Sequence, residues 1–224
     1  MAEITLTIDG QSVTIEEGHT ILEAANQAGI RIPTLCWDED LKPYGGCRLC
    51  IVHVEGIRGL PPACTTVAAD GMAVITENEE ILEARRMVMR LLKADHPNDC
   101  LACRANMNCE LQRTSTELGI YEHGLPPTNR EGTKDVSNPV FTRDMSKCIL
   151  CARCTRTCHE LLGLGAIDLV DRGYAAEPSP FMTDEIRKSS CESCGECVVH
   201  CPTGALAFTN PPPEPESEAV TICP

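Results

Sequence analysis

Two cysteine runs in the C-terminal third of the chain constrain its fold most strongly. Each holds four cysteines with the spacing C-x2-C-x2-C-x3-C, as "CILCARCTRTC" at 148–158 and "CESCGECVVHC" at 191–201. The 224 residues include 16 cysteines but only three Phe, three Tyr and one Trp. Because so few large side chains are available for an apolar core, we expect cross-links through metals or disulfides to stabilise the fold.

The compartment of the protein decides between these two kinds of cross-link. The N-terminal residues "MAEITLTIDG" show no basic start followed by an apolar stretch, so they predict no secretory signal. The sequence also has no run of about 18 apolar residues, which predicts no direct membrane insertion. We therefore expect a cytoplasmic protein with reduced thiols, in which dense cysteines favour metal binding over disulfides.

The charge of the chain excludes one class of partner. Its formal net charge is −14 and its pI about 4.8. Nucleic-acid binding requires a basic face, so no nucleic-acid partner is expected. The acidic balance is compatible with plain solubility, or with steering toward a basic patch on a partner protein.

The spacing of the two runs is typical of bacterial ferredoxins that hold two [4Fe–4S] clusters. In such pairs the fourth cysteine of each run ligates the other cluster. Three cysteines at this spacing wrap a short loop around one cluster, and the fourth lies on the following helix, which faces the second. Zinc usually takes separated cysteine pairs, so it suits these triplets poorly. The predicted [4Fe–4S] ligand sets are Cys148, Cys151, Cys154 and Cys201, and Cys191, Cys194, Cys197 and Cys158.

A third group of cysteines lies near the N-terminus. Cys36, Cys47, Cys50 and Cys64 follow the pattern C-x10-C-x2-C-x13-C. Two glycines in "YGGCRLC" precede Cys47 and would let the backbone approach a cluster and direct N–H groups at sulfur. We predict a [2Fe–2S] site, although four cysteines with one close pair also suit zinc.

A fourth group combines three cysteines with a histidine. His96, Cys100, Cys103 and Cys109 form the pattern H-x3-C-x2-C-x5-C. Three thiolates and one imidazole are also a zinc ligand set. Beside the other three groups we favour a [4Fe–4S] cluster, which makes one [2Fe–2S] and three [4Fe–4S] clusters in total. A neutral imidazole in place of a thiolate should raise the reduction potential, as histidine does in Rieske centres.

Local patterns between these groups predict an α+β chain. "ITLTI" and "SVTIE" flank the turn pair Asp9-Gly10, which is typical of a hairpin, and strands are expected at 49–55, 72–76 and 206–208. Capping boxes at Thr20 and Thr76 predict helices after them, and a short helix is expected within 108–119. In the second of these helices the apolar face is expected to comprise Ile81, Ala84, Val88, Leu91 and Leu92.

These elements divide the chain into five expected segments. They are a β-grasp domain with the [2Fe–2S] site, a small helical domain with the histidine-ligated site, a connecting loop, a ferredoxin-like domain with two [4Fe–4S] sites, and a tail rich in proline and acidic residues. Their expected bounds are 1–77, 78–120, 121–138, 139–209 and 210–224.

The order of the four cysteine groups resembles one known module over about residues 3–209. It is similar to the N-terminal iron–sulfur region of cytosolic formate dehydrogenase catalytic subunits and of [FeFe] hydrogenases. It also resembles the small iron–sulfur subunit of NAD-linked hydrogenases and the large peripheral subunit of respiratory complex I. The terminal "TICP", with Cys223, resembles the start of the "CPYCGVGC" motif that opens the molybdopterin domain of the formate dehydrogenases; a chance tail cysteine is the alternative.

The resemblance implies an electron-transfer subunit of a multi-subunit oxidoreductase. It would relay electrons between a flavin subunit that binds NAD(P) and a catalytic metal subunit. We expect that catalytic partner to be a molybdenum or tungsten formate dehydrogenase, with an NAD-linked or electron-bifurcating hydrogenase as the alternative. The sequence has no P-loop and no G-x-G-x-x-G, so we expect the chain itself to be non-catalytic. An enzyme in its own right and a zinc-stapled scaffold are the rival classes.

Overall fold

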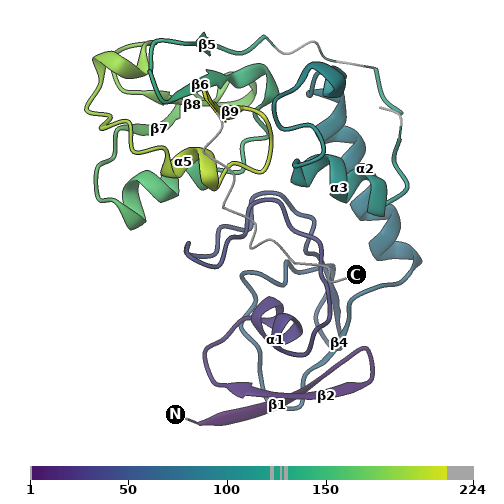
Figure 1. Cartoon of the computed structure of the whole chain (residues 1–224). Helices are drawn as coiled ribbons and strands as arrows, with labels where there is room; N and C mark the ends of the chain where they lie inside the picture. Colours follow the sequence, from purple (N-terminus) through teal and green to yellow (C-terminus); the bar gives the residue numbers. More distant parts are fainter. Residues whose placement is uncertain (1, 122–123, 127, 129–130, 211–224) are drawn as a thin grey trace, which may run out of the picture.

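The computed structural model describes residues 2–121, 124–126, 128 and 131–210. Within them the chain forms three units in sequence order. Figure 1 shows the N-terminal unit at the bottom, the helices α2 and α3 at the upper right, and the C-terminal unit at the upper left. Helices and strands are mixed along the chain, as expected for the α+β class.

The N-terminal unit is a four-stranded sheet with one helix packed on it. The strand order is β2-β1-β4-β3, in which β1 pairs antiparallel with β2 and parallel with β4. The β-grasp fold predicted for this region is therefore confirmed. Its elements are β1 (Glu3–Ile8), β2 (Gln11–Glu16), α1 (Ile21–Gln27), β3 (His53–Val54) and β4 (Ala73–Ile75).

The hairpin and the first helix begin where their sequence signals place them. Asp9 and Gly10 both adopt positive φ, 50° and 82°, as a type I′ turn between paired strands requires. At the start of α1 the Thr20 hydroxyl accepts from the Glu23 N–H, and the Glu23 carboxylate accepts from the Thr20 N–H at 2.6 Å. The predicted capping box is thus confirmed.

The strand expected at 49–55 is mostly replaced by a loop. Only β3 is regular, because the segment before it winds around Cys50. The carbonyls of Leu49 and Ile51 accept hydrogen bonds from the side chain of Arg85, at 2.9 and 2.8 Å. Arg85 lies on α2 (Glu79–Ala94) and is buried. A long side chain therefore satisfies carbonyls that a strand partner would otherwise satisfy.

The predicted cap of α2 is wrong, and its predicted apolar face is correct only in part, since Val88 and Leu92 pack half-buried against an apolar cluster. Asn78 is the cap, because its Oδ1 accepts from the Ile81 N–H at 2.8 Å, while the Thr76 N–H donates to Asp9 instead. Of the predicted apolar face only Ile81 is fully buried, and Leu91 is exposed. The buried face instead follows Ile81, Arg85 and Met89, since Arg85 must reach the loop around Cys50.

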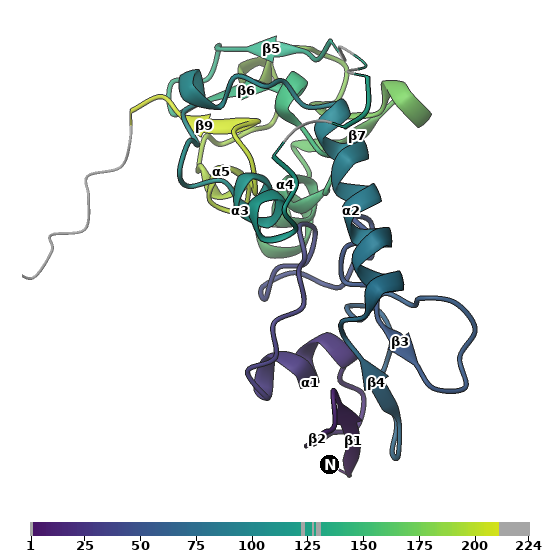
Figure 2. The same cartoon turned by 90° about the vertical axis from the view of Figure 1, so that its right-hand side faces the viewer.

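The helix α2 connects the N-terminal and C-terminal units. Figure 2 shows it running from the end near β4 to the end near the C-terminal sheets. A shared apolar cluster joins the loop of the N-terminal unit to α2 and to the segment around α3 (Glu110–Glu117), a helix that lies within the expected range 108–119. The buried residues of this cluster are Leu35, Leu49, Met89, Leu111, Leu118 and Ile120.

The C-terminal unit consists of two small sheets and short helices around the two cysteine runs. One sheet has the order β5-β6-β9 and the other pairs β7 with β8. The predicted strand at 206–208 is present as β9. The strands are β5 (Lys134–Asp135), β6 (Phe141–Asp144), β7 (Ile167–Val170), β8 (Glu177–Pro180) and β9 (Leu206–Phe208).

Each cysteine run leads into a helix. The first enters α4 (Arg153–Arg156), which continues into a π-helical turn, η3 (Thr157–Leu161), and the second enters α5 (Glu196–Val199). No helix among the described residues is long and apolar enough to cross a membrane. Single 3₁₀ turns complete the described chain: η1 (Cys100–Ala102), η2 (Met145–Lys147), η4 (Gly173–Ala175) and η5 (Ile186–Lys188).

Candidate metal centres

The four cysteines of the N-terminal group meet in the loops between α1 and β4; we call this set the N-terminal site. Cys36, Cys50 and Cys64 are buried and Cys47 is half-buried. Hydrogen bonds from the thiols of Cys47 and Cys64 lower the pKa of Cys36, and they raise the pKa of both donors. The Cys64 thiol also forms a hydrogen bond with Cys50. The four sulfur atoms therefore form one connected group, as a shared metal centre requires.

Backbone N–H groups around the N-terminal site point at sulfur. The Cys47 N–H donates to the Cys36 Sγ at 3.4 Å, and the Gly46 N–H also contacts this sulfur. The Leu35 N–H donates to the Cys47 Sγ at 3.4 Å. Gly45 adopts φ +71°, which glycine permits at little cost, and this turns the following N–H groups toward the sulfurs. Such donors stabilise thiolate charge, whether the metal is a [2Fe–2S] cluster or zinc.

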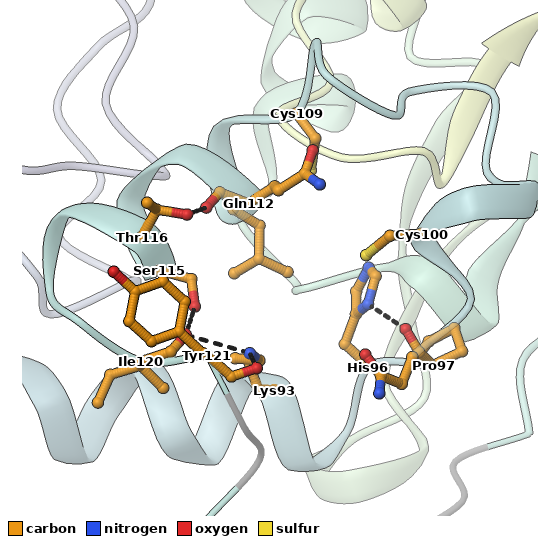
Figure 3. A pocket seen from close by; sticks show the side chains of 12 residues that line it. Lys93, His96, Pro97, Cys100, Cys109, Gln112, Ser115, Thr116, Ile120 and Tyr121 are labelled. Atoms are coloured by element: carbon orange, nitrogen blue, oxygen red, sulfur yellow. Dashed lines mark hydrogen bonds between the residues drawn. The ribbon is translucent and has the colours of Figure 1, made fainter.

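Three of the four residues of the histidine group line a cavity between the end of α2 and α3, and Cys103 lies outside that lining; we call the set of four the histidine site. The cavity has a volume of about 220 Å³ and is lined by His96, Cys100 and Cys109. His96 Nδ1 lies 2.9 Å from the Pro97 carbonyl oxygen, and Figure 3 shows the ring directed toward the Cys100 sulfur. A histidine that donates through Nδ1 to a carbonyl presents the Nε2 lone pair, as metal-ligating histidines do.

Cys103 approaches the histidine site from its side toward the C-terminal unit. Its charge and that of Cys100 help to raise the pKa of Cys109, after burial, which is the largest cause. A Cβ placed on Gly204 would lie 2.4 Å from the Cys103 sulfur, so only glycine fits there. The Cys109 Sγ also lies 3.6 Å from the Pro202 carbonyl oxygen. The histidine site therefore lies directly against residues 202–204.

The two C-terminal runs share their cysteines crosswise. One cavity is lined by the first three cysteines of run one and the last of run two; we call it the inner site. A second cavity, the outer site, is lined by the first three cysteines of run two and the last of run one. The inner site comprises Cys148, Cys151, Cys154 and Cys201, and the outer site comprises Cys158, Cys191, Cys194 and Cys197.

Electrostatics gives a similar grouping, although Cys201 of the inner site also affects Cys197 of the outer site. Burial raises the pKa of Cys151, and the charges of Cys201 and Cys148 raise it further. Burial raises the pKa of Cys197 to about 12, with Cys191, Cys194, Cys201 and Cys158 as the charged neighbours. Crowded thiols with raised pKa values stay protonated unless a cation binds, because unpaired thiolates would repel one another. The ligand sets predicted from the spacing are thus brought together in space.

The two loops repeat the same backbone conformation. Leu150 and Ser193, each two residues after the first cysteine of its run, have φ of 55° and 61°. Their N–H groups donate to the sulfur of that cysteine, at 3.3 and 3.4 Å. Ala152 and Gly195, each following the second cysteine, are also left-handed. Neither leucine nor serine predicts this conformation; the repeated cysteine spacing was the only signal for it.

The donor chemistry of all four sites fits iron–sulfur clusters. Each site offers four soft ligands, of which all are thiols except His96, together with N–H groups directed at sulfur in every site. Cys223 and the tail at 211–224 lie outside the described residues, so the resemblance of "TICP" to a molybdopterin motif stays a prediction.

Comparison with protein families assigns iron–sulfur domains to all three units. Residues 1–79 match a 2Fe-2S iron-sulfur cluster binding domain, and residues 85–123 match the NADH-ubiquinone oxidoreductase-G iron-sulfur binding region. Residues 138–207 match the ferredoxin-like domain of NADH-quinone oxidoreductase subunit 3. One 2Fe-2S domain and further iron–sulfur binding domains are therefore present, while the number of three [4Fe–4S] clusters stays a prediction.

Individual relatives come from hydrogenases and from NADH-ubiquinone oxidoreductases. The chain is 42% identical to the NADP-reducing hydrogenase subunit HndD of Solidesulfovibrio fructosivorans, over 92% of this chain and 36% of that protein. It is 33% identical to the mitochondrial NADH-ubiquinone oxidoreductase 78 kDa subunit of Candida albicans, over 92% of this chain and 28% of that protein. The chain thus spans about a quarter to a third of the length of these relatives.

A solved structure covers nearly the whole fold. It is a chain of an NAD+-reducing [NiFe]-hydrogenase in its H2-reduced state, with a TM-score of 0.87 and 30% identity over 93% of this chain and 88% of that chain. The two structures are therefore similar in the arrangement of their domains as well as in the separate domains. The chain therefore belongs to the family of iron–sulfur modules found in NADH-quinone oxidoreductases and in NAD-linked hydrogenases.

Proposed function

We propose that this chain relays electrons between a flavin subunit that binds NAD(P) and a catalytic metal subunit of a larger oxidoreductase. The supporting observation is that the elements of the inner site contact both the N-terminal site and the histidine site. Clusters of the proposed kind accept and release one electron at a time, at potentials set by ligands, hydrogen bonds and burial.

Contacts to the N-terminal site come from α4, which carries Cys154. The Arg156 Nη2 donates to the Cys36 carbonyl oxygen at 2.5 Å, and its Nη1 donates to the Lys42 carbonyl oxygen at 2.6 Å. The same guanidinium lies 5.2 Å from the centre of the Tyr44 ring, a cation–π distance. These contacts hold the loop that begins at Cys36 against the helix of the inner site.

Contacts to the histidine site come from the segment after Cys201. The Glu110 N–H donates to the Pro202 carbonyl oxygen at 2.9 Å, next to the contact of this carbonyl with Cys109. Lys147, which precedes Cys148, pairs with Asp99 near this junction at 3.5 Å. The surroundings of the inner site thus join it to both the N-terminal site and the histidine site.

For the catalytic partner we propose the formate dehydrogenase type, with a hydrogenase as the second candidate. The formate assignment depends on the resemblance of the cysteine order and of "TICP". The hydrogenase assignment is supported by the relatives HndD and the NAD+-reducing [NiFe]-hydrogenase. Since the chain covers only part of its longer relatives, the substrate and the partner subunits are proposals for either case.

Anaerobic purification of the native complex through a tag on this chain tests the proposal. Molybdenum or tungsten with formate-dependent NAD(P)+ reduction is the expected result. Nickel, or iron alone, with hydrogen-dependent reduction would replace formate dehydrogenase by hydrogenase and retain the relay. A purified chain that contains zinc and is not reduced by dithionite would overturn the relay itself, since zinc has no redox chemistry.

A further inference from the structure

One buried guanidinium lies where three of the four sites meet. Arg153 begins α4 between Cys151 and Cys154, and only 6% of its side chain is exposed. Its Nη1 and Nη2 donate to the two carboxylate oxygens of Glu110, at 2.6 and 2.9 Å. The Nη2 also donates to the Trp37 carbonyl oxygen at 2.6 Å, and the Nη1 to the His200 carbonyl oxygen at 3.5 Å.

Each of these partners is the direct chain neighbour of a predicted ligand. Trp37 follows Cys36 of the N-terminal site, and Glu110 follows Cys109 of the histidine site. His200 precedes Cys201 of the inner site, as Arg153 itself precedes Cys154. The guanidinium therefore binds residues that are chain neighbours of ligands in three different sites. These bound residues belong to all three units of the chain.

The contact between Arg153 and Glu110 has a fixed geometry. A bidentate pair of arginine with carboxylate fixes both distance and orientation, and a buried one is little screened by water. Burial lowers the pKa of Arg153, but the bonds to Glu110 and the negative charges around the guanidinium together raise it overall, so the guanidinium stays charged. A second contact stiffens the same junction, because His200 Nδ1 lies 3.0 Å from Asp38 Oδ2. Lysine could not replace the planar fork, since its ammonium is a single point charge.

We propose that Arg153 is a positioning residue that holds the N-terminal, histidine and inner sites at the separation their electron exchange requires. This inference rests on the proposed relay function and deepens it. In this role Arg153 binds no cluster and takes no part in cluster assembly. Its loss should leave each centre intact and change how the centres communicate.

The test is R153K in the full chain, with clusters assembled without air. The lysine keeps a positive charge beside Glu110 and removes only the fork, so the variant avoids leaving this half-buried carboxylate unpaired. The matched control is R31K. Arg31 also binds a carboxylate, since its Nη2 donates to both carboxylate oxygens of Glu117 of α3 at 2.8 Å. Its side chain is 59% exposed, and Glu117 is not the chain neighbour of a predicted ligand.

Two measurements separate positioning from simple structural support. The first is the microwave power that half-saturates the EPR signal of the reduced [2Fe–2S] centre, which reports magnetic coupling to reduced neighbours. The second is the rate at which electrons redistribute among the centres, followed by freeze-quench EPR after mixing with less than one equivalent of dithionite. For R153K we expect full iron content, weaker coupling and redistribution slowed by about 10-fold or more, by analogy with the loss of activity when outer-shell partners of metal sites are removed. R31K should match the wild type in both.

Three outcomes would overturn the inference. If magnetic coupling and the rate of electron redistribution are unchanged in R153K, the Arg153 fork does not position the centres. Loss of iron from R153K would show that Arg153 supports cluster assembly instead. Wild-type centres that are reduced without exchanging electrons would overturn the proposed relay as well, whereas the first two outcomes leave the relay standing.

Discussion

The two C-terminal cysteine runs have the same spacing and the same loop conformation, yet they lie in different surroundings. In run one Cys151, Cys154 and Cys158 are buried, whereas in run two Cys194 is exposed. The residues at matching positions also differ. Run one places Arg153 and Arg156 where run two places Glu196 and Val199. Both arginines bind other units of the chain, while Glu196 and Val199 are exposed to solvent.

This difference shows that the cysteines and the residues between them have different roles. The cysteine spacing and the left-handed residues after the cysteines set the local loop, and they are common to both runs. The residues between the cysteines set where each loop is placed. Positive charge near a cluster favours its reduced, more negative state, and negative charge disfavours it. We therefore expect the inner centre to have a higher potential than the outer one.

The largest expected effect comes from breaking the crosswise sharing. C201S should abolish the EPR signal of the centre that contains Cys148, although the substituted cysteine belongs to run two. The signal of the outer centre should persist, because that cavity is completed by Cys158. C223S is the matched control and should retain all four signals. Loss of the outer signal alone in C201S would show that each run keeps its own fourth cysteine.

A second prediction concerns the buried ion pair beside the outer site. Asp135 and Arg143 are 4% and 2% exposed and lie 3.5 Å apart. The Asp135 carboxylate also accepts from the N–H groups of Ile186 and Ser137. Burial would raise its pKa, but these donors and Arg143 lower it overall, so it is charged at neutral pH. D135A leaves Arg143 uncompensated and should cost about 3–5 kcal/mol of unfolding free energy.

The same variant sharpens the comparison between the two runs. The segment after Asp135 contacts the outer loop, where Asn138 Nδ2 donates to the Ser193 hydroxyl at 2.9 Å. In urea titrations of D135A followed by EPR, we expect the outer signal to disappear before the inner one. The matched control is E185A, which removes only the exposed pair with Lys188 and should cost less than about 1 kcal/mol. Simultaneous loss of both signals in D135A would contradict this ordering.

Sequence reasoning succeeds here where the signal is local. The hairpin at Asp9-Gly10, the cap at Thr20 and the strand at 206–208 each depend on a few neighbouring residues, and each is present in the fold. Grouping the cysteines also works, because metal spacing is itself a short-range pattern. Failures arise from contacts over long distances. Arg85 replaces the strand partner of Leu49 and Ile51, and no local feature of α2 predicts this.

The junction around Arg153 illustrates the same limit within the candidate sites. Its position between two ligand cysteines was visible in the sequence. Its partners Trp37 and Glu110 lie 116 and 43 residues away along the chain. Only the packing of three units brings them together, so the spacing alone carries no information about this contact.

A third prediction concerns the left-handed position that follows the second cysteine of each run. Run one tolerates Ala152 there, whereas in run two a Cβ on Gly195 would lie 2.8 Å from the Phe208 ring at φ +84°. G195A should therefore lower the unfolding free energy by about 1–3 kcal/mol through crowding and backbone strain. Urea unfolding of the cluster-loaded chain measures this cost. The control is G163A. Gly163 also has a positive φ, but a Cβ there would meet no neighbouring atom, so this variant has the backbone strain without the crowding and should lower the unfolding free energy by less.

The smallest effect is electrostatic. E196Q removes an exposed negative charge from the second helix and should raise the potential of the outer centre, by less than about 1 kcal/mol per electron. The shift should shrink in high salt, since solvent screens exposed charges. A redox titration at two ionic strengths checks both statements. An equal shift of the inner centre would show that Glu196 does not act locally.

An EPR-monitored redox titration of the full chain, purified without air and combined with iron analysis, tests the account most directly. We expect about 14 iron atoms per chain, from one [2Fe–2S] and three [4Fe–4S] clusters. Four separable reducible centres should titrate, with the inner one at a higher potential than the outer. Zinc in place of iron, or fewer than four reducible centres in a chain with full metal content, would contradict these expectations.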